Sequence, residues 1–383
     1  MVTFLKGKHI TSSKHLNSLL GKEMKITSQN DRQYWSRIRL NRALRSQRRK
    51  NYNPNNASSA LVRIGNRYKI SFTESFNTHN DQLLQKLIVL LDLVETWAIK
   101  QEKRLILDFS EAYDIKIEGV ILLYARVHAI QIQTNDTTII SVICSQNSSV
   151  NTILDKSGFY RLCGKRMSSS IKGNWVPMQS AVTSAPIGSQ EELNARESLR
   201  EAITFMGNCI QASNLDKDMS NSMYAAITES VSNVGDHAYL EINNNDEFDI
   251  ALLGKRWWFL TERIGNQLFA VIYDMGMGIP RTLPKKGFFR IIEQYWKTNT
   301  DPEILKAAME YGRSRHRQDK RGKGLSDIKQ FVEMNPMGQL NIISGKGRYE
   351  YNSKTSAESV SDLPMQLRGT LIKWNVCLEP VQP

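Results

Sequence analysis

The sequence predicts two consecutive domains that combine strands with helices, one of class α/β and one of class α+β, behind a basic arm. The chain has 383 residues, which is more than one core accommodates, since domains average about 100 to 200 residues. Hydrophobic residues make up 40% and charged residues 23%, so the chain can bury enough apolar surface to fold. Short apolar runs of strand type alternate with longer runs of helical period, which is the pattern of mixed folds.

The first segment, residues 1–56, is a strongly basic arm. Thirteen Lys and Arg and only two acidic residues lie between Met1 and Lys50, so nearly all of the net charge of +13 sits there. Clustered cations attract phosphates, and one interpretation is that residues 1–50 dock nucleic acid, an acidic partner or an anionic surface. The alternative is a solvated, partly helical tail, because no groove-reading motif accompanies the charge.

Cysteine usage and hydropathy restrict the compartment. The four cysteines, at positions 144, 163, 209 and 377, form no CxxC pair and no disulfide-like spacing, which argues against a metal site and a secreted framework. Charge interrupts each apolar run well short of the about 20 residues that cross a bilayer, and the first residues lack a signal-peptide core. We therefore expect a cytoplasmic protein without a membrane segment.

The second segment, residues 57–166, predicts an α/β domain. Its expected elements are a hairpin in VRIGNRYKISFT, an amphipathic helix in DQLLQKLIVLLDLVETWAIKQ, a buried strand in RLILDFS that ends at Asp108, a helix in GVILLYARVHAIQIQ, a strand in TTIISVICS and a Ser-capped helix in SSVNTILDKSGFYRL. A stretch rich in Ser, Pro and Gly follows over 167–190, where we predict a linker and the domain boundary.

This order resembles the STAS domain of anti-sigma-factor antagonists, most specifically in LILDFS before Gly119 and in the NTILDKSGFYRL tail. Where that family usually carries Asp-Ser-Ser-Gly with a phosphorylated serine, this chain has Lys116, Ile117, Glu118 and Gly119. The acceptor hydroxyl is missing, so the resemblance does not extend to phosphorylation. We expect Glu118 to be an ordinary solvated first-turn glutamate; the alternative is a permanent negative charge at a helix start.

The third segment, residues 191–383, begins with helical patterns and carries polar residues at fixed spacing. ARESLREAITFMGNCIQ predicts one helix, and DMSNSMYAAITESVSNVGDHAY predicts another. In the second of these, Glu229, Asn233 and His237 recur every four residues, so they are expected near one helical face. His237 is expected to be structural, because no second histidine or cysteine lies at ligand spacing.

Two glycine-rich stretches follow in the same segment. The strand pair RWWFLTERIGNQLFAVIYD is expected to turn at Gly265–Asn266, and its last residue, Asp274, begins the loop DMGMGIP. A multi-glycine turn after a buried strand favours backbone held close to a ligand. Farther on, KRGKGLSDIKQFVE places two glycines at the start of a helix, where free amides form an anion site.

Order and spacing of these motifs, completed by Gly369–Thr370 before LIKWNV, resemble the GHKL ATPase family over about residues 194 to 378. Within it, TESVSNVGDHAY is closest to the serine kinases that act as anti-sigma factors. The resemblance implies a Bergerat-type α/β sandwich, with a mixed sheet and helices on one face. It also implies ATP and Mg²⁺ as cofactors.

The resemblance further implies a role for each matching residue. Asp274 would accept a hydrogen bond from the adenine amino group, with support from Thr370. Asn233 would bind Mg²⁺, and Glu229, one turn earlier, would orient or deprotonate the attacking water or hydroxyl. Residues 281–321, with Arg313, Arg315 and Arg317, would form a lid. The remaining nucleotide contacts would come from Gly276, Gly278, Arg321, Gly322, Lys323, Gly324 and Leu325.

Two classes of function stay open. In one, the chain is an enzyme that hydrolyses ATP or phosphorylates a protein serine or threonine to control a protein partner. In the other, it binds ATP as a switch that changes partner affinity. Free-standing members of the two families bind each other, so their fusion predicts an intramolecular brake that deletion of residues 57–165 would release. A histidine-kinase role is disfavoured, and a homodimer is left open.

Overall fold

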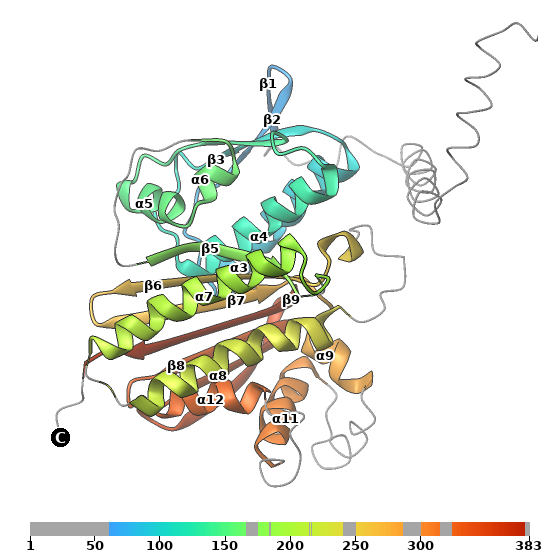
Figure 1. Cartoon of the computed structure of the whole chain (residues 1–383). Coiled ribbons are helices and arrows are strands. Elements are labelled where there is room, and N and C mark those ends of the chain that lie inside the picture. Colours follow the sequence, from blue (N-terminus) through green and yellow to red (C-terminus); the bar gives the residue numbers. More distant parts are fainter. Residues whose placement is uncertain are drawn as a thin grey trace, which may run out of the picture. The chain divides into compact units, whose positions relative to one another are not determined.

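Two β-sheets with helices packed against them form the computed structural model, an α+β arrangement (Figure 1). The structure describes residues 61–165, 175–183, 185–213, 215, 217–239, 250–285, 300–314 and 324–379, all within the unit Ala60–Pro383. The predicted arm, and with it the docking role of residues 1–50, lies outside the described residues. Within these ranges no helix combines the length and apolarity that crossing a bilayer requires.

The first sheet has the strand order β1-β2-β3-β4. The strands are β1 (Leu61–Ile64), β2 (Arg67–Ser71), β3 (Arg104–Asp108) and β4 (Ile140–Ile143). β1 and β2 pair antiparallel and confirm the predicted hairpin, whereas β2, β3 and β4 run parallel to their neighbours. β3 ends at Asp108, as the sequence predicts.

The helices of this segment are α3 (Asp81–Glu95), continued by a π-helical segment Thr96–Lys100, and α4 (Ile117–Thr134), α5 (Ser148–Lys156) and α6 (Phe159–Leu162). Two of these helices, α3 and α5, begin at capping asparagines. The side chain of Asn80 caps α3 by accepting two backbone N–H groups. The predicted serine cap of α5 is wrong: Asn147 is the cap and accepts the Ser149 amide at 2.8 Å.

The second sheet has the strand order β5-β6-β7-β9-β8, and its neighbouring strands all pair antiparallel. The strands are β5 (Trp175–Val182), β6 (Arg256–Ile264), β7 (Gln267–Asp274), β8 (Gln339–Asn352) and β9 (Ala357–Cys377). The mixed sheet expected for this segment is therefore wrong. The reason is that β6 and β7, like β8 and β9, follow each other through short turns, which only antiparallel neighbours allow.

β5 lies inside the stretch 167–190 that the sequence predicts as a linker, so that prediction is wrong for Trp175–Val182. The strand is at the edge of the sheet and contains Pro177. Its pairing with β6 is irregular between Val176 and Gln179, which brackets this proline. An edge strand with a bulge tolerates the missing N–H of proline, and this is why a composition typical of loops still forms a strand.

Helices on one face of the second sheet close a hydrophobic core. The helices of this segment are α7 (Gln190–Gln211), α8 (Lys217–Asn233), continued by a π-helical segment Val234–Ala238, and α9 (Ile279–Thr282), α11 (Asp301–Ser314) and α12 (Gly324–Glu333). Short 3₁₀ turns cover Ile250–Leu253 and Leu283–Lys285. Met206 of α7, Ile227 of α8 and Phe331 of α12 pack in one cluster with Phe259 and Trp374 of the sheet.

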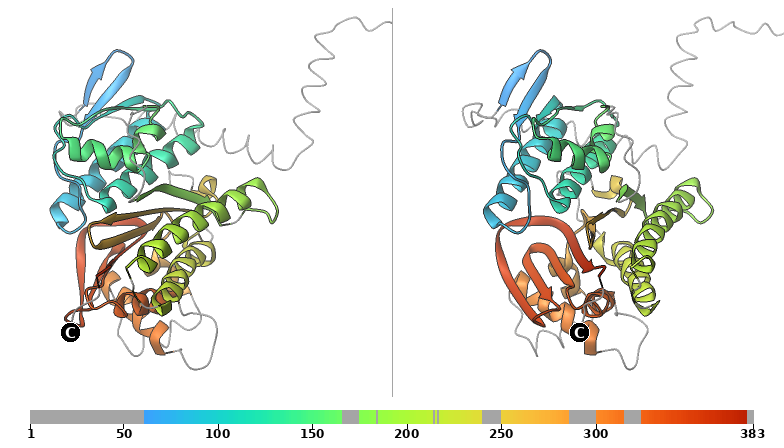
Figure 2. Two further views of the ribbon diagram at one scale, coloured as in Figure 1. Left: turned by 60° about the vertical axis from the view of Figure 1, so that its left-hand side comes forward. Right: turned by 90° about the vertical axis from the view of Figure 1, so that its left-hand side faces the viewer.

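The opposite face of the second sheet is covered as well, by α3 and α4 of the first segment (Figures 1 and 2). Side chains alternate along β6, so that Trp257 faces the core of α7 and α8 and Trp258 faces the core of the first segment. Val271 and Leu371 also belong to the core of the first segment. The prediction that helices pack on only one face of this sheet was therefore incomplete. Apolar side chains lie on both faces of these strands, and both faces have to be buried.

Candidate functional site

Asp274 ends β7 as a buried carboxyl group beside β9. It lies opposite Thr370 in the strand register, and its Oδ1 accepts the backbone N–H of Gly276 at 2.8 Å. Burial raises the pKa of Asp274 to about 7, against the lowering effect of hydrogen bonds from the amides of Gly276 and Thr370. An isolated buried carboxyl is costly to ionise, so the group gains from any further hydrogen-bond donor that reaches it.

The glycines around Asp274 are required by contacts of the chain with itself. A β-carbon at Gly276 would lie 2.2 Å from the carbonyl oxygen of Ala238, and one at Gly369 would lie 1.9 Å from that of Asp274. The Met277 N–H donates to the same Ala238 oxygen at 2.8 Å. The sequence interpretation, that glycine allows approach to a ligand, is thus incomplete, because close backbone packing already explains both positions.

Ser344 of β8 is a site residue that the sequence did not indicate. It is fully buried, pairs with Thr370 in the register, and lies 3.0 Å from the Thr370 hydroxyl. Its Oγ donates to the Gly369 carbonyl at 3.1 Å and accepts the Ile279 N–H at 2.9 Å. Because a hydroxyl has one hydrogen, Thr370 is the donor to Ser344 and keeps its own lone pairs free. Only the register of β8 on β9 reveals this pairing.

Helix α8 presents Glu229 and Asn233, both partly buried, one turn apart. The Nδ2 of Asn233 is buried without a hydrogen-bond partner. Burial raises the pKa of Glu229, and the nearby carboxylates of Asp327 and Asp236 raise it further. His237 lies in the π-helical segment Val234–Ala238, so the three residues do not continue on one α-helical face as predicted, since the π-helical turn is wider.

Helix α12 begins at Gly324, close to the predicted helix start. The side chain of Leu325 packs against the core of the second sheet. α12 packs along α8, which brings its first-turn residue Asp327 beside Glu229. Arg321, Gly322 and Lys323 lie outside the described residues, as do 286–299 and 315–321 of the predicted lid.

The predicted residues within the described ranges therefore come from four adjoining elements. Asp274 and Thr370 sit on paired strands, and the loop after Asp274 bonds to the π-helical segment that continues from Asn233. The start of α12 lies beside Glu229. In the part of the chain that the structure describes, no group of three or more His, Cys, Asp or Glu is placed to hold a metal ion. A metal here would thus rely on few protein ligands.

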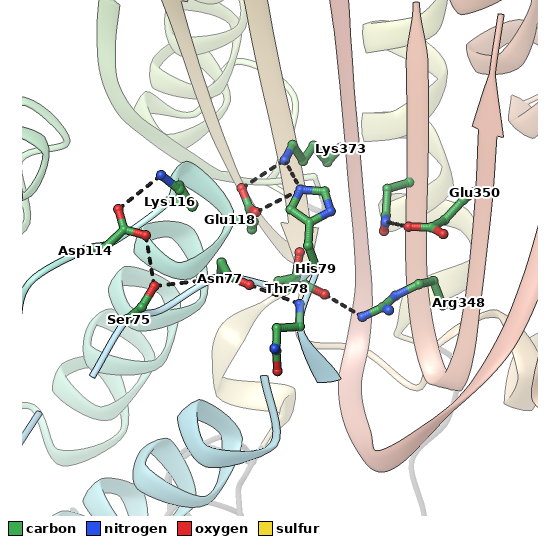
Figure 3. Close-up of polar contacts among 12 residues, drawn as sticks. Ser75, Asn77, Thr78, His79, Asp114, Lys116, Glu118, Arg348, Glu350 and Lys373 are labelled. Carbon is green, nitrogen blue, oxygen red and sulfur yellow. Dashed lines mark hydrogen bonds and ion pairs between the residues drawn. The ribbon is translucent and has the colours of Figure 1, made fainter. Parts of the chain in front are cut away.

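A second polar cluster lies between the first segment and β9 (Figure 3), and the prediction made for it from the sequence is wrong. Glu118 is not solvated, as we expected, but fully buried. Its carboxylate lies 3.2 Å from Lys373 Nζ and 3.5 Å from His79 Nε2. Burial and the charge of Lys373 lower the pKa of His79. The prediction for Glu118 was wrong because its partner Lys373, on β9, lies more than two hundred residues away in the chain.

This cluster lines two clefts, of about 360 and about 890 Å³, that share His79 and Lys373. The lysines of the larger cleft are paired, Lys116 with Asp114, Lys156 with Glu262, and Lys373 with Glu118. Compensated charge exerts little pull on an ionic ligand. The cluster is best described as a contact between the two segments.

A comparison of the chain with protein-family models, with curated proteins and with solved structures gives no match.

Proposed function

We propose that the chain binds Mg-ATP around Asp274 and turns it over to control a protein partner, as a GHKL-type ATPase or serine/threonine kinase. The observation that carries the proposal is the environment of Asp274, a buried strand-end carboxyl group whose hydrogen bonds come from backbone amides. The amino group of adenine supplies the additional donor that such a group gains from. Guanine presents a carbonyl oxygen in that place, so the same carboxylate disfavours it.

The hydroxyl pair beside Asp274 supports this orientation. Ser344 fixes the Thr370 hydroxyl by hydrogen bonding and leaves its lone pairs available. Thr370 therefore offers an acceptor next to the carboxylate, on the neighbouring strand. The amino group of adenine has two hydrogens, so the carboxylate and the hydroxyl oxygen can each accept one of them.

Asn233 is the residue that fits a magnesium ion. Its side-chain amide ends α8, and its buried Nδ2 is left without a partner, so this N–H group is available to a phosphate oxygen beside the ion. The side-chain oxygen is a hard ligand of the kind Mg²⁺ prefers alongside phosphate oxygens. The ion supplies neutralisation of phosphate charge when bound.

Glu229 fits the role of general base. Burial and two neighbouring carboxylates raise its pKa, and a carboxylate with a raised pKa accepts a proton more readily near neutral pH. It lies one turn before Asn233 on α8, on the side of the α12 start. From there it would take the proton of a water molecule, for hydrolysis, or of a serine or threonine hydroxyl, for phosphorylation.

The proposal is tested by titrating the full chain with ATP and Mg²⁺. We expect Asp274→Asn to weaken ATP binding by about ten- to a hundredfold, the size of a hydrogen bond to a charged group. Asp362→Asn, an exposed change on the same strand β9, is the matched control and should leave the Kd unchanged. Absence of any adenine-nucleotide affinity in the unmodified chain would overturn the proposal.

A switch without essential catalysis is the second candidate. It is favoured by the continuity of β9, which carries Thr370 on one face and Lys373, bound to the first segment, on the other. A strand shared in this way could report ATP binding to the first segment without chemistry. Removal of the Glu229 carboxylate separates the two candidates. If the variant still binds ATP but loses function, catalysis is essential; if it keeps function, ATP binding is sufficient.

A further inference from the structure

We infer that Glu95, a residue of the first segment, positions the adenine end of the nucleotide site through Arg368 of β9. The inference rests on the proposed function, and it makes the first segment a structural part of the site rather than an attached module. Glu95 is a positioning residue, because its contacts are with the strand that carries Thr370 and not with the ligand.

The geometry is a network of charges between α3, α4 and β9. Arg368 binds Glu95 through both of its terminal nitrogens, at 2.9 and 3.1 Å. Arg126 of α4 binds the same carboxylate and also Asp92, at 2.9 Å. The side chains of Arg126 and Glu95 are exposed by only 4% and 10%, so the centre of this network is buried. A bidentate pair of this kind fixes direction as well as distance.

The backbone of Arg368 continues the connection to Asp274. Its carbonyl oxygen accepts the hydroxyl of Tyr273 at 2.7 Å, and Tyr273 directly precedes Asp274 on β7. The next residue, Gly369, packs its backbone against that of Asp274. A displacement of Arg368 therefore moves both the residue before Asp274 and the residue before Thr370.

The charge balance of the network shows that it is built to stay ionised. Burial opposes ionisation of Glu95, but Arg126 and Arg368 together hold its pKa below the ordinary value. Neutralising Glu95 removes the carboxylate charge that holds Arg126 and Arg368 together, which allows Arg368 to move outward. Removing Arg368 instead leaves Glu95 paired with Arg126, so this variant is expected to cost less folding stability.

A second contact holds β9 on the far side of the site. Lys373 follows Thr370 by three residues and binds Glu118 at 3.2 Å, as Figure 3 shows. The short piece of β9 that carries Gly369 and Thr370 is thus tied to the first segment at both ends. The side chain of Thr370 lies between these two fixed points.

The test compares Glu95→Gln, Arg368→Gln and the double variant in the full chain. The readout is the ratio of the Kd for Mg-GTP to that for Mg-ATP, since loss of global stability alone would not change base preference. We expect each single variant to lower this ratio by about tenfold, as a small misplacement of site groups does. The double variant should lower it no further, because both changes break one connection.

Glu74→Gln is the matched control, because it removes an exposed ion pair with Lys86 inside the first segment, away from β9. It should leave the ratio unchanged. If the unmodified chain binds neither nucleotide, the proposed function itself fails. If it prefers ATP and the folded variants keep the same preference, this inference fails while the proposed function stands. Should Glu95→Gln not fold, Arg368→Gln decides alone.

Discussion

The two faces of the second sheet both bury apolar side chains, but they differ in where their polar groups lie. On the face under α7, α8 and α12 the polar groups gather around Asp274, at one end of the strands. On the face under α3 and α4, paired charges such as Glu95 with Arg126 and Glu118 with Lys373 are buried inside the contact. Buried ion pairs lose hydration, so they set position more than they add stability. We propose that the first of these faces receives the ligand, whereas the other fixes the first segment in place.

Deletion of residues 57–165 is expected to have the largest effect, because it removes the segment that covers one face of the second sheet. It would expose Trp258, Leu260, Val271 and Tyr273 on the face that the first segment covers. Each such side chain contributes about 1.5 to 3 kcal/mol when buried, so the loss approaches the whole stability of a domain. We expect the remaining chain to be insoluble or unfolded, as measured by circular dichroism and size-exclusion chromatography. A soluble, folded fragment would show that the two segments are independent.

That expectation changes how the predicted intramolecular brake is tested. Deletion was expected to raise ATP turnover, but a chain that loses its fold reports nothing about inhibition. Point variants at the polar contacts, such as Glu118→Gln, keep the apolar cover and are the suitable test. Higher turnover in such a variant supports a brake, and unchanged turnover in a folded variant contradicts it.

Periodicity predicts the elements of this chain better than the contacts between them. The strand pair that turns at Gly265–Asn266 and the strand that ends at Asp108 follow from residue patterns alone. Burial of Glu118 and the pairing of Ser344 with Thr370 depend on which distant segment covers a residue, which no local pattern contains. β5 was missed because an edge position tolerates its Pro177. Local signals thus select the candidate residues, whereas their supporting contacts depend on tertiary packing.

Removal of the Glu229 carboxylate tests whether the proposed site catalyses ATP turnover. If Glu229 is the general base, Glu229→Gln should lower ATP turnover by about 10² to 10⁴-fold, the usual contribution of such a group. The Kd for Mg-ATP should change little, because the side chain keeps its size. Phosphate release under saturating ATP measures the effect, with Glu201→Gln, an exposed change on α7, as the control. Unchanged turnover would favour the switch.

Acidification is expected to change the folding stability in opposite directions through His128 and Asp274, which belong to the two different faces. His128 accepts the Trp258 indole N–H at 3.1 Å, and burial, with a smaller effect of Arg256, lowers its pKa to about 4 from 6.5. The unfolded chain binds this proton more readily, so stability falls as the pH drops from 6.5 towards 4. Asp274 has the opposite shift, from 3.8 to about 7, so its contribution rises as the pH drops from 7 towards 4.

Two variants separate these opposed contributions. Between pH 7 and 5 we expect each to amount to about 2 kcal/mol, so that they largely cancel in the unmodified chain. His128→Gln should therefore gain stability on acidification relative to the unmodified chain, and Asp274→Asn should lose it. Urea unfolding at both pH values measures this, and the other titrating groups cancel because all three proteins share them. Parallel pH profiles would contradict both assignments.

The pH dependence of ATP binding sharpens the role of Asp274 further. If adenine binds the carboxylate, protonation near pH 7 competes with the nucleotide, so affinity should fall by about tenfold from pH 8 to pH 6. ATP itself titrates in this range, and Asp274→Asn therefore serves as the reference, since its binding is weaker but carries only the titration of the ligand. Calorimetric titration of both proteins across this range gives the comparison. Equal slopes would contradict a purine bound to the ionised Asp274, because the ionised group is the stronger acceptor. A steeper slope for the unmodified chain places the purine on the ligand face of the sheet.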